Sequence, residues 1–224
     1  MSEATGLLRP GLLDGISLLV AGAPPPEDSR LVAGAPVPAD SLGRTAGEAC
    51  RELGARVHTC VPDGADEAIV DLMVTAAVAE MGGLDLLVVD GAGLFAHGLA
   101  KGAGARAALR TCLDATWNVT RAVVNHAFLP AAPSAPGRRI VYLAPPPTAD
   151  RPEIGQHADA ARAGLENLGR TLSTEWARHG ITLVTIAAGE ATPAGEVAAL
   201  TAYLASPAGA YFSGCLLDLR GPER

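Results

Sequence analysis

Lysine is almost absent from this chain: Lys101 is the only one, beside sixteen arginines, in a segment rich in glycine and alanine that we interpret as a loop. The formal charge is −7 and no basic cluster occurs, which argues against a nucleic-acid partner, because nucleic acids bind to cationic surfaces. No apolar run is long enough to span a bilayer, and the N-terminus carries no basic stretch ahead of a hydrophobic segment. We therefore expect a cytoplasmic protein that binds neither nucleic acid nor membrane.

Cysteine is sparse as well. The four cysteines lie far apart, with no Cys-x-x-Cys pair and no histidine at ligand spacing; they are Cys50, Cys60, Cys112 and Cys215. Metal sites and disulfide frameworks need closer or paired ligands. We expect reduced thiols in mostly buried positions and no metal site. Alanine, glycine and proline are abundant, a bias typical of a GC-rich bacterial genome.

The remaining composition is typical of one globular domain. The chain has 224 residues, of which 49% are apolar and 18% charged, enough to bury a substantial core. Short apolar runs predict strands at residues 16–21, 54–61, 84–89, 139–143, 181–187 and 214–219. Longer segments between them predict helices at residues 40–53, 65–81, 107–128, 156–179 and 195–205. This alternation predicts a three-layer α/β domain over residues 1–224, with a doubly wound, mainly parallel sheet.

The most regular of these helices is the one at residues 156–179. Its apolar residues recur at spacings of three and four and form one stripe, namely Ala161, Leu165, Leu168, Leu172 and Trp176. Glu166 precedes Arg170 by one turn, a favourable order for an ion pair on a helix. Gly180 follows the last turn, where glycine commonly ends a helix.

Three stretches of the chain, "GRRIVYL", "RAGLENLGRTLSTEWARHGITLVTIAAG" and "YLASPAGAYFSGCLLDLRG", resemble the short-chain dehydrogenase/reductase family. The resemblance implies a shortened Rossmann-like fold. Family members carry a catalytic Asn, a Ser after the strand, and Tyr-x-x-x-Lys in the next helix. Those positions hold Cys112, Pro145, Ala158 and Arg162 here. Alanine and proline have no proton to transfer, and arginine is a poor general base, so the resemblance implies the scaffold without its catalytic groups.

The stretch that should bind the cofactor is also altered. Members of the family follow the first strand with a glycine-rich turn, whose backbone approaches the pyrophosphate. Here a Pro-rich insertion at residues 22–40 replaces that turn; its five prolines remove backbone donors, and Glu27 and Asp28 add negative charge. The residues of this vestigial cleft are Gly22, Gly34, Gly43, Val61 and Asp90. We expect no NAD(P) to bind there.

Two further family segments are short or missing in this sequence. The second predicted strand leads almost at once into the helix at 65–81, so we expect that a β-α unit has been trimmed. After Gly189 the family has a long segment that covers the substrate, whereas this chain passes directly to the helix at 195–205. We therefore expect the substrate-covering segment to be absent.

The resemblance also predicts how the chain associates. In the family, the helices matching 107–128 and 156–179, together with the C-terminal strand, contact other subunits. The leading hypothesis is a catalytically inactive subunit that supports an active dehydrogenase or ketoreductase acting on a 3-hydroxy/3-keto acyl-type substrate. It would resemble the inactive chain of a heteromeric hydroxyacyl-CoA-type dehydrogenase; association with itself, as a dimer or tetramer, is the other possibility.

Two alternatives stay open on the sequence. One is an active NAD(P)-dependent oxidoreductase with a displaced site, in which His157 and Asp159, beside the lost tyrosine position, act with Tyr142 or Cys112. The other is a sensor that binds a small ligand in the vestigial cofactor cleft. Neither alternative requires a metal.

Overall fold

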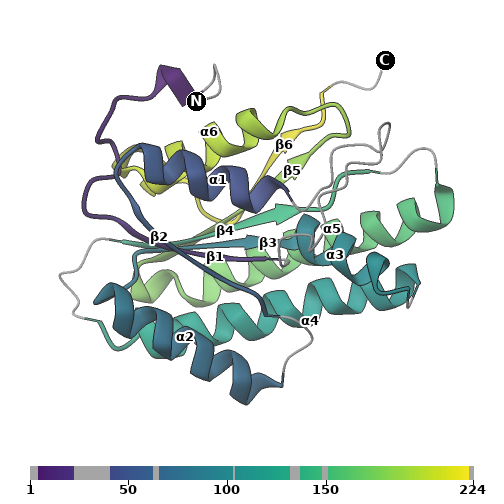
Figure 1. Ribbon diagram of the computed structural model, residues 1–224, viewed down its shortest axis with the longest axis horizontal. Coiled ribbons are helices and arrows are strands. Elements are labelled where there is room, and N and C mark those ends of the chain that lie inside the picture. Colours follow the sequence, from purple (N-terminus) through teal and green to yellow (C-terminus); the bar gives the residue numbers. More distant parts are fainter. Residues whose placement is uncertain are drawn as a thin grey trace.

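A parallel sheet forms the middle layer of the molecule (Figure 1). The computed structural model describes residues 5–22, 41–62, 66–102, 104–131, 137–147 and 151–221. Within these ranges the strands are β1 (Ser17–Ala21), β2 (Arg56–Cys60), β3 (Leu86–Asp90), β4 (Arg138–Ala144), β5 (Ile181–Ala188) and β6 (Cys215–Leu219). Their order is β2-β1-β3-β4-β5-β6, and every neighbouring pair is parallel. The predicted three-layer α/β class with a mainly parallel sheet is confirmed.

Helices cover both faces of this sheet, which is why β1 and β3 are buried on both sides and are apolar apart from Ser17 and Asp90. The helices are α1 (Ser41–Glu52), α2 (Glu67–Met81), α3 (Gly91–Ala100), α4 (Ala105–Val123), α5 (Pro152–Glu175) and α6 (Ala194–Ala205). In Figure 1, α1 and α6 lie on one face, and α2, α4 and α5 lie on the other. Each face has its own apolar core. None of the helices in the described ranges is long and apolar enough to cross a membrane.

The strand order reverses direction at β1. β1 lies between β2 and β3: the chain first crosses from β1 to β2 on one side of it, and then returns from β2 to β3 on its other side. In open parallel sheets, ligands bind outside the carboxyl ends of the strands at such a reversal. All the strands are parallel, so their carboxyl ends meet at one edge of the sheet.

The predicted stripe of α5 faces the core. Ala161, Leu165 and Leu172 are buried, and the two other members pack against the same cluster. The ion pair between Arg170 and Glu166 forms at 2.6 Å. α5 begins at Pro152, earlier than predicted, and after Glu175 a 3-10 turn leads to Gly180 in the left-handed conformation, with φ of 67°.

One helix was not predicted. The segment Gly91–Ala100 forms α3, and the chain turns directly after it at Lys101, which caps its C-terminus. Its three glycines disfavour a helix by local propensity, but packing reverses that preference. A Cβ on Gly98 would lie 2.7 Å from the Cα of Ala108, so glycine permits α3 to approach α4 closely.

Two other boundaries differ from the predictions. The helix predicted at 107–128 begins at Ala105 and changes at Val123 into a π-helix over Val124–Phe128.

The insertion at 22–40 lies outside the described residues except for Gly22, and so does Gly34.

Candidate functional site

At the carboxyl end of β3, one carboxylate accepts hydrogen bonds from two backbone N–H groups. Asp90 is the last residue of β3, and only 2% of it is exposed. Its Oδ2 accepts a hydrogen bond from the backbone N–H of Gly43, and its Oδ1 accepts one from Gly93, both at 2.9 Å. Gly22 follows β1 and is held by its N–H, which donates to the carbonyl of Cys60 at 3.0 Å. Val61 follows β2 and is half-buried.

Cys112, at the family's Asn position, lies in the interior on α4 and is fully buried. Its Sγ donates a hydrogen bond to the carbonyl of Gly91 at 3.3 Å. Burial raises the pKa of the thiol to about 12, and the negative charge of Asp90 acts in the same direction. A buried thiol of this kind stays protonated and is a poor nucleophile.

The residues that the resemblance places at the family's Ser and Tyr positions, Pro145 and Ala158, have no ionisable side chain. Ala158 on α5 is 1% exposed and belongs to the apolar core that contains Cys112. Pro145 directly follows β4 and is buried. What Pro145 contributes is its backbone carbonyl, which accepts a hydrogen bond from Nη1 of Arg162 at 3.4 Å.

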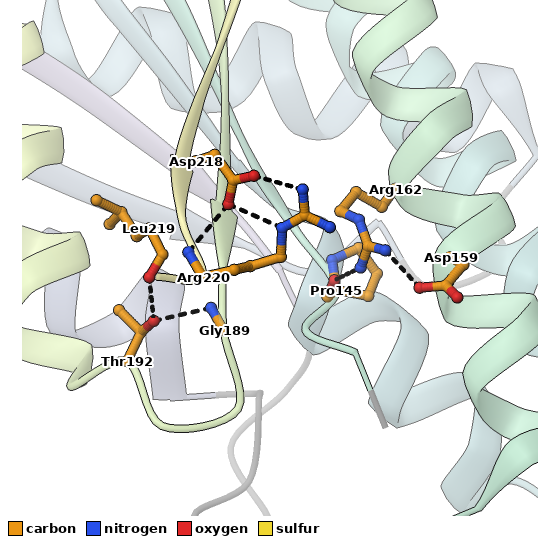
Figure 2. A network of polar contacts seen from close by, with 8 residues as sticks. All are labelled: Pro145, Asp159, Arg162, Gly189, Thr192, Asp218, Leu219 and Arg220. Carbon is orange, nitrogen blue, oxygen red and sulfur yellow. Dashed lines mark hydrogen bonds and ion pairs between the residues drawn. The ribbon is translucent and has the colours of Figure 1, made fainter. Parts of the chain in front are cut away.

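Arg162, which the resemblance places at the family's Lys position, is one member of a group of polar residues near the carboxyl ends of β4, β5 and β6 (Figure 2). Its side chain is 12% exposed and forms an ion pair with Asp159, one turn earlier on α5. On β6, Asp218 accepts hydrogen bonds from the backbone N–H of Arg220 at 2.9 Å and from its Nε at 2.8 Å. The hydrogen bond from the Arg220 side chain is the main reason that the pKa of Asp218 falls to about 2; the charge of Arg162 adds to it.

The connection that follows β5 is short, as predicted. Residues 189–193 alone join β5 to α6. Thr192 fixes this turn, because its Oγ1 accepts from the N–H of Gly189 and donates to the carbonyl of Leu219, both at 2.8 Å (Figure 2). The turn is therefore tied to the end of β6.

Three polar residues of this cluster, Thr192, Asp218 and Arg220, were not identified from the sequence. Asp218 lies in β6 and Arg220 directly follows the strand, so the contact between them depends on how the chain bends after Leu219. Their position opposite Arg162 could not be read from spacing, because it depends on β6 pairing with β5.

The displaced site considered above is not assembled by the described residues. Tyr142 is fully buried, its hydroxyl is 3.0 Å from Oγ1 of Thr120, and burial raises its pKa well above the ordinary range. Nδ1 of His157 lies 2.8 Å from the carbonyl of Glu153 in its own helix. Among the contacts of the described residues, none joins His157 to Cys112, and no group of His, Cys, Asp and Glu there could hold a metal ion.

Thiol labelling tests the protonation of Cys112. With its pKa near 12, the thiolate fraction at pH 8 is about 1,000-fold below that of a free cysteine, so iodoacetamide should label Cys112 correspondingly slowly in the native protein. Peptide mass spectrometry after timed labelling measures the rate, with urea-unfolded protein as the control. Native labelling as rapid as in urea would show an activated cysteine and support the displaced site.

Comparison with known proteins agrees with this architecture. A family model described as short chain dehydrogenase matches residues 11–200. The chain therefore belongs to the short-chain dehydrogenase/reductase family. A search of curated proteins found no match.

Solved structures of similar fold include dehydrogenases from two bacteria. A citronellol catabolism dehydrogenase of Pseudomonas aeruginosa is 26% identical, with a TM-score of 0.70, and the match covers 95% of this chain and 96% of that one. A short-chain dehydrogenase of Mycobacterium smegmatis is 24% identical, also with a TM-score of 0.70, and covers 96% and 95%. The NADP complex of RhlG from Pseudomonas aeruginosa is 19% identical, with a TM-score of 0.70, and covers 96% and 99%.

Proposed function

We propose that this chain is a catalytically inactive member of its family, which associates with an active dehydrogenase or ketoreductase and supports it. The substrate of that partner would be of the 3-hydroxy/3-keto acyl type. The observation that carries the proposal is Ala158: the position where the family places its proton-transferring tyrosine holds a methyl group, 1% exposed and packed in the apolar core.

The neighbouring positions support the same conclusion. Family catalysis moves a proton between the substrate's carbonyl oxygen and a tyrosine whose pKa is lowered by a lysine. Arg162 keeps a positive charge near that place, but its guanidinium binds Asp159 and the carbonyl of Pro145. It therefore acts within the fold, by holding the β4–α5 connection to α5, and has no tyrosine to activate.

The face that would meet the partner is the outer face of α4. Trp117 is 40% exposed there, unusual for so large an apolar side chain. It lines a surface hollow of about 540 Å³ together with Arg110, Asp114 and Glu67. Tryptophan and arginine are the residues most often found at the energetic centres of protein interfaces. This face also matches the helix through which the resemblance predicts association.

Co-expression tests the proposal. The chain, carrying an affinity tag, is produced together with an untagged active reductase encoded beside it in its own genome, and the purified material is analysed by native mass spectrometry. We expect a complex that contains both chains and a partner that retains activity longer at elevated temperature than it does alone. A stable homo-oligomer of this chain, with no reductase bound, would contradict the proposal.

A charge placed on the outer face of α4 should weaken that complex. We expect Trp117→Glu to raise the dissociation constant by about 30-fold or more, because a central aromatic anchor typically contributes at least 2 kcal/mol. The matched control is Leu72→Glu on α2, which introduces the same charge at a residue that is 72% exposed and outside the predicted contact. Equal dissociation constants for the two variants would place the contact elsewhere.

A further inference from the structure

Asp90 joins the starts of two helices to the end of one strand. Each oxygen of its carboxylate accepts one backbone N–H, that of Gly43 in the first turn of α1 and that of Gly93 in the first turn of α3. The side chain is buried at the carboxyl end of β3, the strand that pairs with β1. One carboxylate thus satisfies donors from two helix N-termini.

The surrounding backbone closes tightly on this side chain. A Cβ on Gly43 would lie 2.6 Å from the Cβ of Asp90 and 2.7 Å from its Oδ2, closer than real side-chain atoms approach. A Cβ on Gly22 would lie 3.1 Å from the same Cβ. Glycine at both positions therefore lets the start of α1 and the end of β1 approach the carboxylate.

The donors that Asp90 occupies are of the kind that bind phosphate in this type of fold. A helix that follows the first strand presents free N–H groups and a partial positive charge, and both favour an anion. Here an anion from within the chain is already bound to the third residue of α1. A phosphate at the same helix end would lie next to a buried negative charge and would lose one of its donors, and both effects oppose its binding.

We propose that Asp90 determines the ligand specificity of the cleft: its carboxylate takes the place of a bound phosphate at α1 and excludes ligands that carry phosphate, dinucleotides included. This inference deepens the proposed function by assigning the loss of cofactor binding to one side chain. It rests on the proposed function only in requiring that the wild-type chain binds no dinucleotide.

Asparagine at position 90 would change both the charge of the side chain and the number of N–H groups that it can accept. The amide is neutral, and it offers one acceptor oxygen where the carboxylate offers two. One of the two N–H groups, that of Gly43 or that of Gly93, would then lose its partner. Asp90→Asn thus removes the internal anion while keeping the size of the side chain.

The test compares the wild-type protein with Asp90→Asn and with Asp85→Asn as the control. Asp85 directly precedes Leu86, the first residue of β3, and accepts the N–H of Ser17 at 2.9 Å. The same chemical change is therefore made at the opposite end of this strand from Asp90. Pyrophosphate and ADP-ribose are titrated into each protein by calorimetry at constant ionic strength. Hydrogen exchange of the Gly43 and Gly93 amides is followed by NMR.

We expect Asp90→Asn to bind pyrophosphate about tenfold or more tightly than the wild type and Asp85→Asn do. One of the two glycine amides should exchange about tenfold or more faster in Asp90→Asn, and pyrophosphate should slow it again. A folded Asp90→Asn protein that gains no affinity for pyrophosphate, or that protects both amides as the wild type does, would overturn the inference.

A measurement on the wild type alone keeps the test decisive if Asp90→Asn does not fold. Millimolar pyrophosphate should leave the amide resonance of Gly43 in its place, and a saturable shift would overturn the inference. The two proposals also fail separately. A wild-type chain that binds no active reductase would contradict only the proposed function, whereas an unresponsive Asp90→Asn beside a wild type that binds no NADH contradicts only the role of Asp90.

Discussion

Replacing Asp90 with alanine should lower the free energy of unfolding by about 3 to 6 kcal/mol. Two charge-assisted hydrogen bonds are lost, each contributing about 1.5 to 3 kcal/mol, and two helix starts lose their capping group. The donors left behind are buried, which prevents water from replacing the carboxylate fully. Urea unfolding followed by circular dichroism measures the loss.

The matched control for that experiment is Asp85→Ala. Asp85 accepts a single backbone N–H, that of Ser17, and lies in a partly exposed place, so its removal should cost about 1 to 2 kcal/mol. The difference between the two variants isolates the bridging role of Asp90. A loss at Asp90 no larger than that at Asp85 would mean that its two hydrogen bonds contribute little to stability.

Restoring the family's tyrosine should damage the protein without restoring activity. Ala158→Tyr, alone or with Arg162→Lys, places a phenol ring where a methyl group is 1% exposed, and we expect a loss of about 3 kcal/mol or more. Arg162→Lys also removes the guanidinium that contacts both Asp159 and the carbonyl of Pro145. We expect no measurable reduction of 3-keto substrates by NADH or NADPH.

The control for this substitution lies on the same helix. Ala160 is exposed, so Ala160→Tyr adds the same ring to α5 without entering the core and should change stability by about 0.5 kcal/mol or less. Thermal unfolding of both variants separates overpacking from loss of helix propensity. If Ala158→Tyr were as stable as Ala160→Tyr and reduced a keto substrate, the crevice would be open and only the tyrosine missing.

Much of the fold could be predicted because the relevant signals are local. The apolar stripe of α5, the ion pair of Glu166 with Arg170 and the stop at Gly180 are each encoded within a few residues, and the structure confirms them. The buried strands could be recognised for the same reason. The exception is α3, whose glycines oppose a helix locally and favour it only through close packing on α4.

The arrangement of the candidate site could not be predicted from the sequence, because it depends on contacts between residues that are far apart in the chain. The family positions at Cys112, Pro145, Ala158 and Arg162 could be located by resemblance. Their surroundings could not, because the cluster of Arg162 with Asp218 arises only when β6 pairs beside β5. Asp90 was recognised as a cleft residue, but its bond to Gly43 spans 47 positions of the chain.

These observations form one account. We infer that this chain places its own groups where the family holds cofactor and substrate: a carboxylate at α1, a methyl group at the proton-transfer position, and two arginines paired with aspartates at the strand ends. On this account the outer faces of the helices carry the function, and the crevice supports the fold.

Calorimetric titration of the purified wild-type chain with NADH and NADPH tests this account most directly. We predict no saturable heat up to about 1 mM of either nucleotide, and no absorbance change at 340 nm when a 3-keto acyl substrate is added. A dissociation constant in the micromolar range for either nucleotide, together with turnover of that substrate, would contradict it.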